Sequence, residues 1–142
     1  MLKKVLASRL ERKMTNGRTA PCLITCEDCE QAGEDVELVV KFSAGCFERE
    51  KNLIREAVAA MLAADIGLPV PEPFLVEVDD AFLSSIADPV LHANIANSSR
   101  IAFGLKRLPS GFMVWAQDGM VPSALAEAAA EVLIFDAIIV NS

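Results

Sequence analysis

Histidine, cysteine and long apolar runs are scarce in this sequence of 142 residues. The two richest apolar segments are interrupted by acidic side chains, namely Asp65 in the first and Glu127, Glu131 and Asp136 in the second. Neither segment could therefore cross a bilayer, which excludes an integral membrane protein. The apolar run at residues 5–7 is far too short for the hydrophobic region of a signal peptide. With only four cysteines and no export signal, the sequence favours a reducing cytoplasm.

Basic residues are in the minority, with 13 Lys and Arg against 20 Asp and Glu and a formal net charge of −7. A protein that binds the phosphate backbone of nucleic acids needs clustered lysines and arginines, so the composition disfavours nucleic acid as a partner. The charge is uneven, because residues 1–20 contain six basic side chains and a single acidic one, Glu11. This short basic stretch on an acidic body could meet an anion.

The only histidine, His92, has no serine or carboxylate at an informative spacing, which gives no support to a Ser-His-Asp triad. We expect it to be a solvated residue of a loop. No EF-hand spacing follows Asp79, Asp80 or Asp88, and we interpret these three as turn residues. None of these four residues is therefore assigned as a metal ligand.

The chain holds enough apolar material for one compact unit, since 53% of its residues are hydrophobic. Residues 2–13 are compatible with a first strand or a short helix. The apolar patterns then predict strands at 21–25 and 36–42, a helix at 48–66, a strand at 74–78, a short helix at 79–86, a polar loop at 87–100, a strand at 101–108 and a helix from 122 to about 141. This order predicts an α+β fold with a largely antiparallel sheet.

The two longer helices have recognisable features at their ends and on their faces. The helix at 48–66 carries one apolar stripe, made of Leu53, Ile54, Ala57, Val58, Met61 and Leu62, and Gly67 is expected to end it. Ser123 is a candidate N-cap of the last helix. That helix stays apolar almost to the end of the chain and has no capping glycine, so we expect the natural fold to continue past Ser142.

Three cysteines, Cys22, Cys26 and Cys29, are spaced C-x3-C-x2-C, the spacing with which radical-SAM enzymes hold a four-iron cluster. Those enzymes need a barrel much longer than this chain, and Cys22 falls in a predicted strand. We favour small apolar core residues as the interpretation, while a zinc site that also uses Cys46 stays open as a weaker one.

A lysine and a glutamate form the more specific constellation. On the strand at 36–42, Lys41 shares a face with Glu37 and Val39, opposite Val36, Leu38 and Val40. Lys41 could present its ammonium to a phosphate if a carboxylate on a neighbouring helix held it in place. Glu56 is the candidate, because it lies within the apolar stripe, where an unpaired glutamate is unfavourable. A solvated lysine and a helix-border glutamate remain the alternative.

Several segments resemble the N-terminal lobe of bacterial HipA-like kinases. They are Asn16-Gly17-Arg18-Thr19-Ala20-Pro21, Val39-Val40-Lys41-Phe42, Asn52-Leu53-Ile54-Arg55-Glu56, Ile66-Gly67-Leu68-Pro69-Val70-Pro71-Glu72 and residues 134–142. The likeness is densest over residues 16–72 and looser over 79–122. It implies one partial domain, in which residues 1–121 form a kinase-like N-lobe and residues 122–142 form the first helix of a C-lobe.

The resemblance also implies roles for individual residues. Lys41 would contact the phosphates of ATP, Glu56 would pair with Lys41, and the turn with Gly17 and Arg18 would cover the phosphates. Residues 103–108 would be the last strand before the hinge that reads adenine. The family's catalytic Asp, an Arg and the ligands for Mg²⁺ would follow directly after Ser142, so this chain would contain no catalytic residue and be inactive alone.

A second hypothesis comes from another class of protein. In it, the chain is a non-catalytic interaction module, a split or degenerate kinase lobe that docks through its apolar C-terminal helix. Its partner would be a separate catalytic lobe, an antitoxin or a protein substrate.

Overall fold

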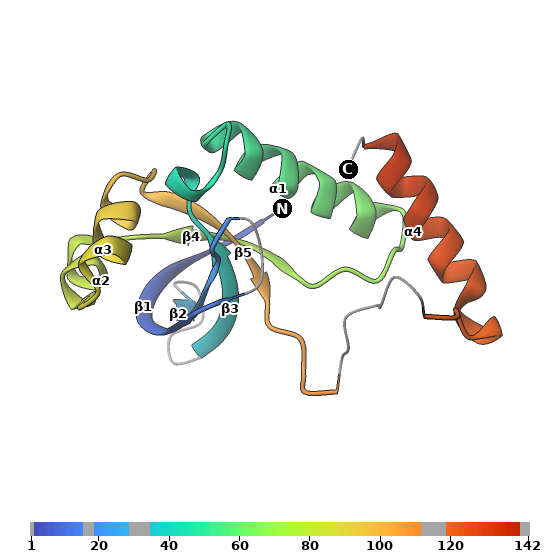
Figure 1. Ribbon diagram of the computed structural model, residues 1–142, viewed down its shortest axis with the longest axis horizontal. Helices are drawn as coiled ribbons and strands as arrows, with labels where there is room; N and C mark the ends of the chain where they lie inside the picture. Colours follow the sequence, from blue (N-terminus) through green and yellow to red (C-terminus); the bar gives the residue numbers. More distant parts are fainter. Residues whose placement is uncertain (1, 16–18, 29–34, 112–118, 140–142) are drawn as a thin grey trace.

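The computed structural model describes residues 2–15, 19–28, 35–111 and 119–139, and its centre is a closed five-stranded barrel (Figure 1). The strands are β1 (Lys3–Lys13), β2 (Cys22–Asp28), β3 (Asp35–Lys41), β4 (Pro73–Glu77) and β5 (Ile101–Lys106), in the order β1-β2-β3-β5-β4. The mixed α+β class is as predicted. The first segment is a strand rather than a helix.

The barrel is not antiparallel throughout. Four neighbouring pairs are antiparallel, but β1 and β4 close the barrel as a parallel pair, with Val5 opposite Val76. A parallel pair requires a long crossover, and here β2, β3 and a helix lie between the two strands in the sequence. Register shifts after Ala7 and Leu10 interrupt the ladder between β1 and β2. Such bulges bend a strand and so help the sheet to close.

The barrel interior forms the main core of the molecule. It is filled by small and branched side chains from all five strands, including Val5, Cys22, Ile24, Cys26, Leu38, Val40, Val76 and Ala102. Gly104 leaves the space that this filling needs, because a Cβ there would lie 3.0 Å from Val76 Cγ2 and 3.2 Å from Leu38 Cδ1. The alternation predicted for residues 36–42 is confirmed, since Leu38 and Val40 point into this core.

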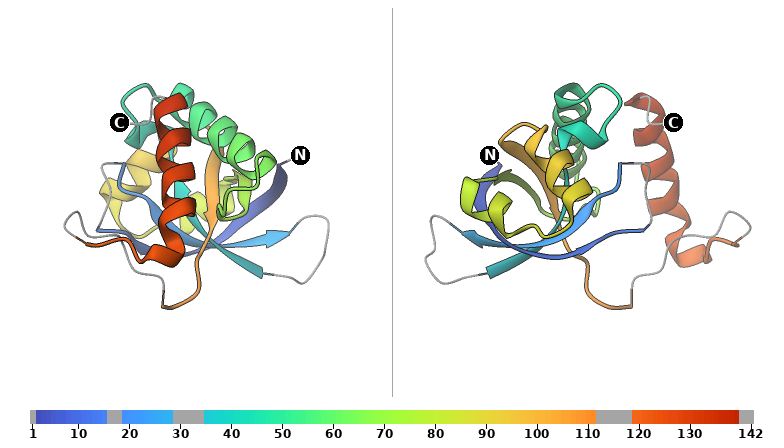
Figure 2. Two further views of the ribbon diagram at one scale, coloured as in Figure 1. Left: turned by 90° about the vertical axis from the view of Figure 1, so that its right-hand side faces the viewer. Right: turned by 60° about the vertical axis from the view of Figure 1, so that its left-hand side comes forward.

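Two short helices, α2 (Asp80–Ser85) and α3 (Pro89–Ala96), lie together beside one end of the barrel (Figure 2). Phe82 of α2, Ile86 directly after α2, and Leu91 and Ile95 of α3 are buried and join the barrel core. The prediction of a polar loop at 87–100 is therefore wrong, and His92 lies in a helix rather than a loop.

The aspartates near these helices have a structural role that the sequence analysis missed. Asp88 accepts hydrogen bonds from the Val90 and Leu91 amides, and Pro89 begins α3 at the position that proline favours. Asp79 accepts from the Phe82 amide at 2.7 Å and caps α2 in the same way. Asp79 and Asp88 are thus helix N-caps, not solvated turn residues.

The helix α1 (Glu50–Asp65) crosses the outside of the barrel. It ends as predicted at Gly67, whose φ of 81° is a left-handed conformation that favours glycine. Only Leu53 and Ala63 are buried on it, whereas Ile54, Val58, Met61 and Leu62 are exposed. The predicted stripe is therefore largely uncovered by the described residues, because α1 contacts the barrel along a narrow line.

The last helix, α4 (Ala126–Ile138), stands apart from the barrel and has no buried residue. A short 3-10 turn, η2 (Ser123–Leu125), precedes it. Ser123 makes no capping hydrogen bond, so the prediction of an N-cap there is wrong. Within the described ranges, no helix combines the length and the apolar character needed to span a membrane.

Candidate functional site

The outer face of the barrel between β3 and β5 combines one cationic side chain with apolar ones. Lys41 lies opposite Phe103 and Val39 lies opposite Leu105 in the antiparallel register. Paired residues of an antiparallel ladder share a face, so these four side chains form one strip along the two strands. The ammonium therefore lies at one end of an apolar surface.

Lys41 and Glu56 meet above this strip. The Nζ atom of Lys41 donates hydrogen bonds to both carboxylate oxygens of Glu56, at 2.8 and 2.7 Å. The two side chains are 30% and 32% exposed, so the pair is reachable from solvent. An ammonium has three donors, and pairing with a single carboxylate leaves capacity for a further anion.

The position of Glu56 follows from how α1 packs. Leu53, one turn earlier, is buried against Phe103 and Cys46 in a second, smaller core that also receives Ala57 and Ala60. Residues three and four apart lie on one side of a helix, so the contact of Leu53 turns Glu56 toward β3. The structure thus brings together the two side chains that the sequence singled out.

A pocket of about 700 Å³ opens beside the ion pair. Its lining includes Lys41, Glu56, Asn52, Phe103 and Leu105, together with Ile139. The volume is in the range of small-molecule sites, and an apolar strip that ends in a cation suits a ligand with a flat apolar part and a negative group. A second pocket of about 480 Å³ is lined by charged side chains of both signs and does not include Lys41.

The structure describes only part of the turn that is predicted to cover the phosphates. Gly17 and Arg18 lie outside the described residues. Thr19, which follows them, contacts the turn after β3: a Cβ on Gly45 would lie 2.6 Å from the Thr19 carbonyl oxygen. Only glycine at position 45 allows this close contact. Thr19, in the connection between β1 and β2, therefore lies next to Gly45, four residues after Lys41.

The cysteines do not form a common site in the described residues. Cys22 and Cys26 are fully buried inside the barrel, and Cys46 lies in the smaller core under α1. Burial raises the pKa of all three thiols, that of Cys26 to about 12. Cys29 lies outside the described residues, and among those that are described no three metal-ligating side chains come together. Cys22 and Cys26 are thus core residues, as favoured from the sequence.

Sequence reasoning missed the polar groups around the start of α1. Ser43, the first residue of the 3-10 turn η1 (Ser43–Gly45) and two residues after the end of β3, is buried, and its hydroxyl donates to Glu50 Oε1 at 3.0 Å. Asn52 Oδ1 accepts from the Glu48 amide at 3.0 Å. No local pattern marks these residues, because their partners are brought together by the turn between β3 and α1.

Comparison with known proteins identifies the family. The family model described as HipA-like kinase matches residues 7–142. Searches of curated proteins and of solved structures each returned no match. The matched range includes Lys41 and Glu56 and covers nearly the whole chain, and the protein therefore belongs to the HipA-like kinase family.

Proposed function

We propose that this chain is the nucleotide-binding portion of an ATP-dependent serine/threonine-type kinase, with residues 1–121 as its N-lobe. The observation that carries the proposal is the ion pair between Lys41 on the third strand and Glu56 on the following helix. In protein kinases a lysine at this place contacts the nucleotide phosphates and a glutamate on the helix holds it. A cytoplasmic location is consistent with ATP as the ligand.

The groups around the pocket suit ATP. The Lys41 ammonium would meet the phosphates, and Glu56 would keep it in position while the third N–H donor of the ammonium stays available to a phosphate oxygen. Phe103 and Leu105 line the pocket and offer an apolar surface to the base. The Gly17 and Arg18 turn would cover the phosphates, which the contact between Thr19 and Gly45 supports.

Bound Mg²⁺–ATP supplies the phosphoryl group and the cation that neutralises its developing charge. We assign no ligand of that Mg²⁺ to Lys41 or Glu56, because the family resemblance places the metal ligands after Ser142. Residues 122–142 would form the first helix of a C-lobe, and the catalytic Asp and the metal ligands would follow Ser142. The chain alone would then transfer no phosphate.

The gene sequence after the Ser142 codon tests this division directly. Codons for Asp and Arg at once, with an Asn several residues later, would support it. A stop codon would contradict it and would turn attention to a separately encoded lobe.

The nucleotide site is tested by replacing the partner of Lys41. In the full-length protein, we expect Glu56→Gln to weaken ATP binding about ten-fold in a calorimetric titration, because an amide no longer fixes the ammonium by charge. The matched control is Glu77→Gln, which removes an ion pair with Lys4 (2.6 Å) elsewhere on the barrel. Equal affinity of the Glu56→Gln variant and the unaltered protein would contradict the site.

A second candidate function rests on α4. Leu133 and Ile138 are 69% and 72% exposed although the helix is strongly apolar. We propose that the chain is a split or degenerate kinase lobe and that a separately encoded catalytic lobe covers this helix. Light scattering that finds a stable monomer without affinity for such a lobe would contradict this docking role. If the chain instead captured an antitoxin or a protein substrate, that protein would be the partner in place of the catalytic lobe.

A further inference from the structure

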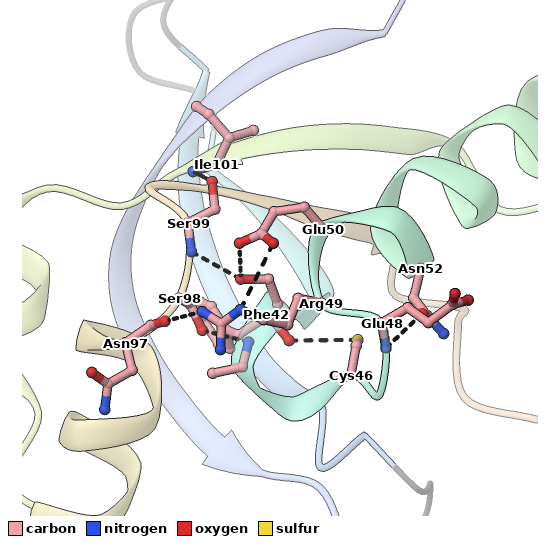
Figure 3. A network of polar contacts seen from close by, with 12 residues as sticks. Phe42, Cys46, Glu48, Arg49, Glu50, Asn52, Asn97, Ser98, Ser99 and Ile101 are labelled. Atoms are coloured by element: carbon pink, nitrogen blue, oxygen red, sulfur yellow. Dashed lines mark hydrogen bonds and ion pairs between the residues drawn. The ribbon is translucent and has the colours of Figure 1, made fainter.

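The turn between β3 and α1 connects three parts of the molecule around the Lys41–Glu56 pair. The Ala44 amide donates to Ser98 Oγ at 3.0 Å, and the Ser99 amide donates to Ser43 Oγ at 2.9 Å. Both contacts tie η1 to the connection between α3 and β5, and Figure 3 shows Ser98 and Ser99 beside the segment that leads into α1. With Thr19 packed on Gly45, the turn is held from two sides.

Ser43 is at the centre of this arrangement. It is only 1% exposed, and its hydroxyl both accepts from the Ser99 amide and donates to Glu50 Oε1. The pKa of Glu50 is lowered, first by its own backbone amide and then by the Ser43 hydroxyl. The carboxylate is thus the form that the start of α1 stabilises, and Ser43 is one of its donors.

Arg49 adds a second restraint at the same place. Its φ of 52° is a conformation that non-glycine residues adopt only when their surroundings impose it. The guanidinium donates to the Asn97 carbonyl and lies 3.8 Å from Glu50 (Figure 3). The first turn of α1 is therefore fixed relative to the α3–β5 connection.

These contacts bear on Glu56 through the helix. Glu50 and Glu56 are six residues apart on one continuous helix, about 9 Å along its axis. Ser43 in turn follows Lys41 by only two residues. One hydroxyl therefore links the segment after the strand that carries the lysine to the helix that carries the glutamate.

We propose that Ser43 is a positioning residue of the nucleotide site: through Glu50 it sets the place of α1 and so keeps Glu56 on Lys41. The inference rests on the proposed nucleotide-binding function and adds a residue that touches neither ligand nor ion pair. Without the hydroxyl, the first turn of α1 loses its tie to β3, and the Lys41–Glu56 distance becomes less well fixed.

The test measures the chemical reactivity of Lys41, which reports on its contact with Glu56, and it needs no nucleotide. Two hydrogen bonds to the Glu56 carboxylate hold Lys41 Nζ in place, so Lys41 should react with an acylating reagent less readily than a lysine side chain without such contacts. Trace labelling with acetic anhydride, read by mass spectrometry, gives the reactivity of Lys41 relative to the exposed Lys51 of α1. We expect Ser43→Ala to raise this ratio about five-fold, and Ser85→Ala, which removes the hydrogen bond to Phe82 O, to leave it unchanged.

A double-mutant cycle separates positioning from general destabilisation. In a Glu56→Gln background, Ser43→Ala should raise the ratio by less than about two-fold, because the contact that it positions is already lost. Glu50→Gln retains an acceptor oxygen for Ser43 and should stay within about two-fold of the unaltered chain, whereas Glu50→Ala should behave like Ser43→Ala. Glu50→Ala also replaces Ser43→Ala as the test if that buried change prevents folding.

Two results would overturn the role of Ser43. One is an unchanged Lys41 ratio in both Ser43→Ala and Glu50→Ala; the other is an equal increase with and without the Glu56 carboxylate. A protein that binds no ATP would refute the proposed function, but the acylation result would still decide whether Ser43 positions the pair.

Discussion

Lys41→Ala is expected to lower the affinity of the full-length protein for ATP by about 100-fold, which corresponds to about 2.7 kcal/mol. The change removes the cation that would meet the phosphates. It also leaves the Glu56 carboxylate unpaired in the pocket, where it repels the polyphosphate. Hydrogen bonds that involve charged groups have strengths of this order. Calorimetry or displacement of a fluorescent nucleotide measures the loss.

The fold should survive this change, because the Lys41 side chain is about one-third exposed and lies outside the barrel core. A matched control is Lys4→Ala, which breaks a comparable ion pair with Glu77 on another part of the barrel. It should change ATP affinity by less than about two-fold. Equal losses in both variants, or full affinity in Lys41→Ala, would count against the site.

The second large effect concerns Cys26. Its thiol is fully buried, and burial raises its pKa to about 12. Relative to an ordinary cysteine, this lowers the thiolate fraction about 1000-fold at neutral pH, and thiolate is the form that reacts. Iodoacetamide at about pH 8 should therefore leave Cys26 unmodified in the native protein and alkylate it rapidly in denaturant.

The same shift predicts how stability depends on pH. The native pKa of Cys26 is above that of the unfolded chain, so the folded state holds the proton more tightly. This contribution is fully present below about pH 9 and is lost as the pH rises from there toward about 12. A melting temperature that falls over this range would agree. Rapid alkylation of Cys26 in the native protein, prevented by iron or zinc, would instead restore the metal-site hypothesis.

Local patterns predicted the features that involve a few neighbouring residues. Alternation over 36–42 placed Leu38 and Val40 inside and Lys41 outside, and the spacing within 48–66 drew attention to Glu56. Gly67 ended the helix for the reason that its residue type suggested. The two members of the candidate site were accessible from the sequence because each lies on a regular element whose faces are defined by its period.

Features that depend on distant contacts were not accessible in this way. The parallel pairing of β1 with β4 arises only when the sheet closes. Asp88 and Pro89 begin α3, but the polar residues that follow them made the segment look like a loop. The stripe on α1 was correct as a pattern, but its composition did not reveal that the barrel covers so little of it. Likewise, Gly45 is explained only by Thr19, which approaches it from another loop.

The most direct test of the central claim is an NMR titration of the full-length protein, labelled in its lysine side chains, with ATP. The account predicts that the Lys41 signal shifts saturably, with the dissociation constant found by calorimetry, while Lys4 and Lys51 stay unchanged. The Glu56→Gln variant should need more ATP for the same shift. Saturable ATP binding that leaves the Lys41 signal in place would contradict the account, since the nucleotide would then lie away from the ion pair.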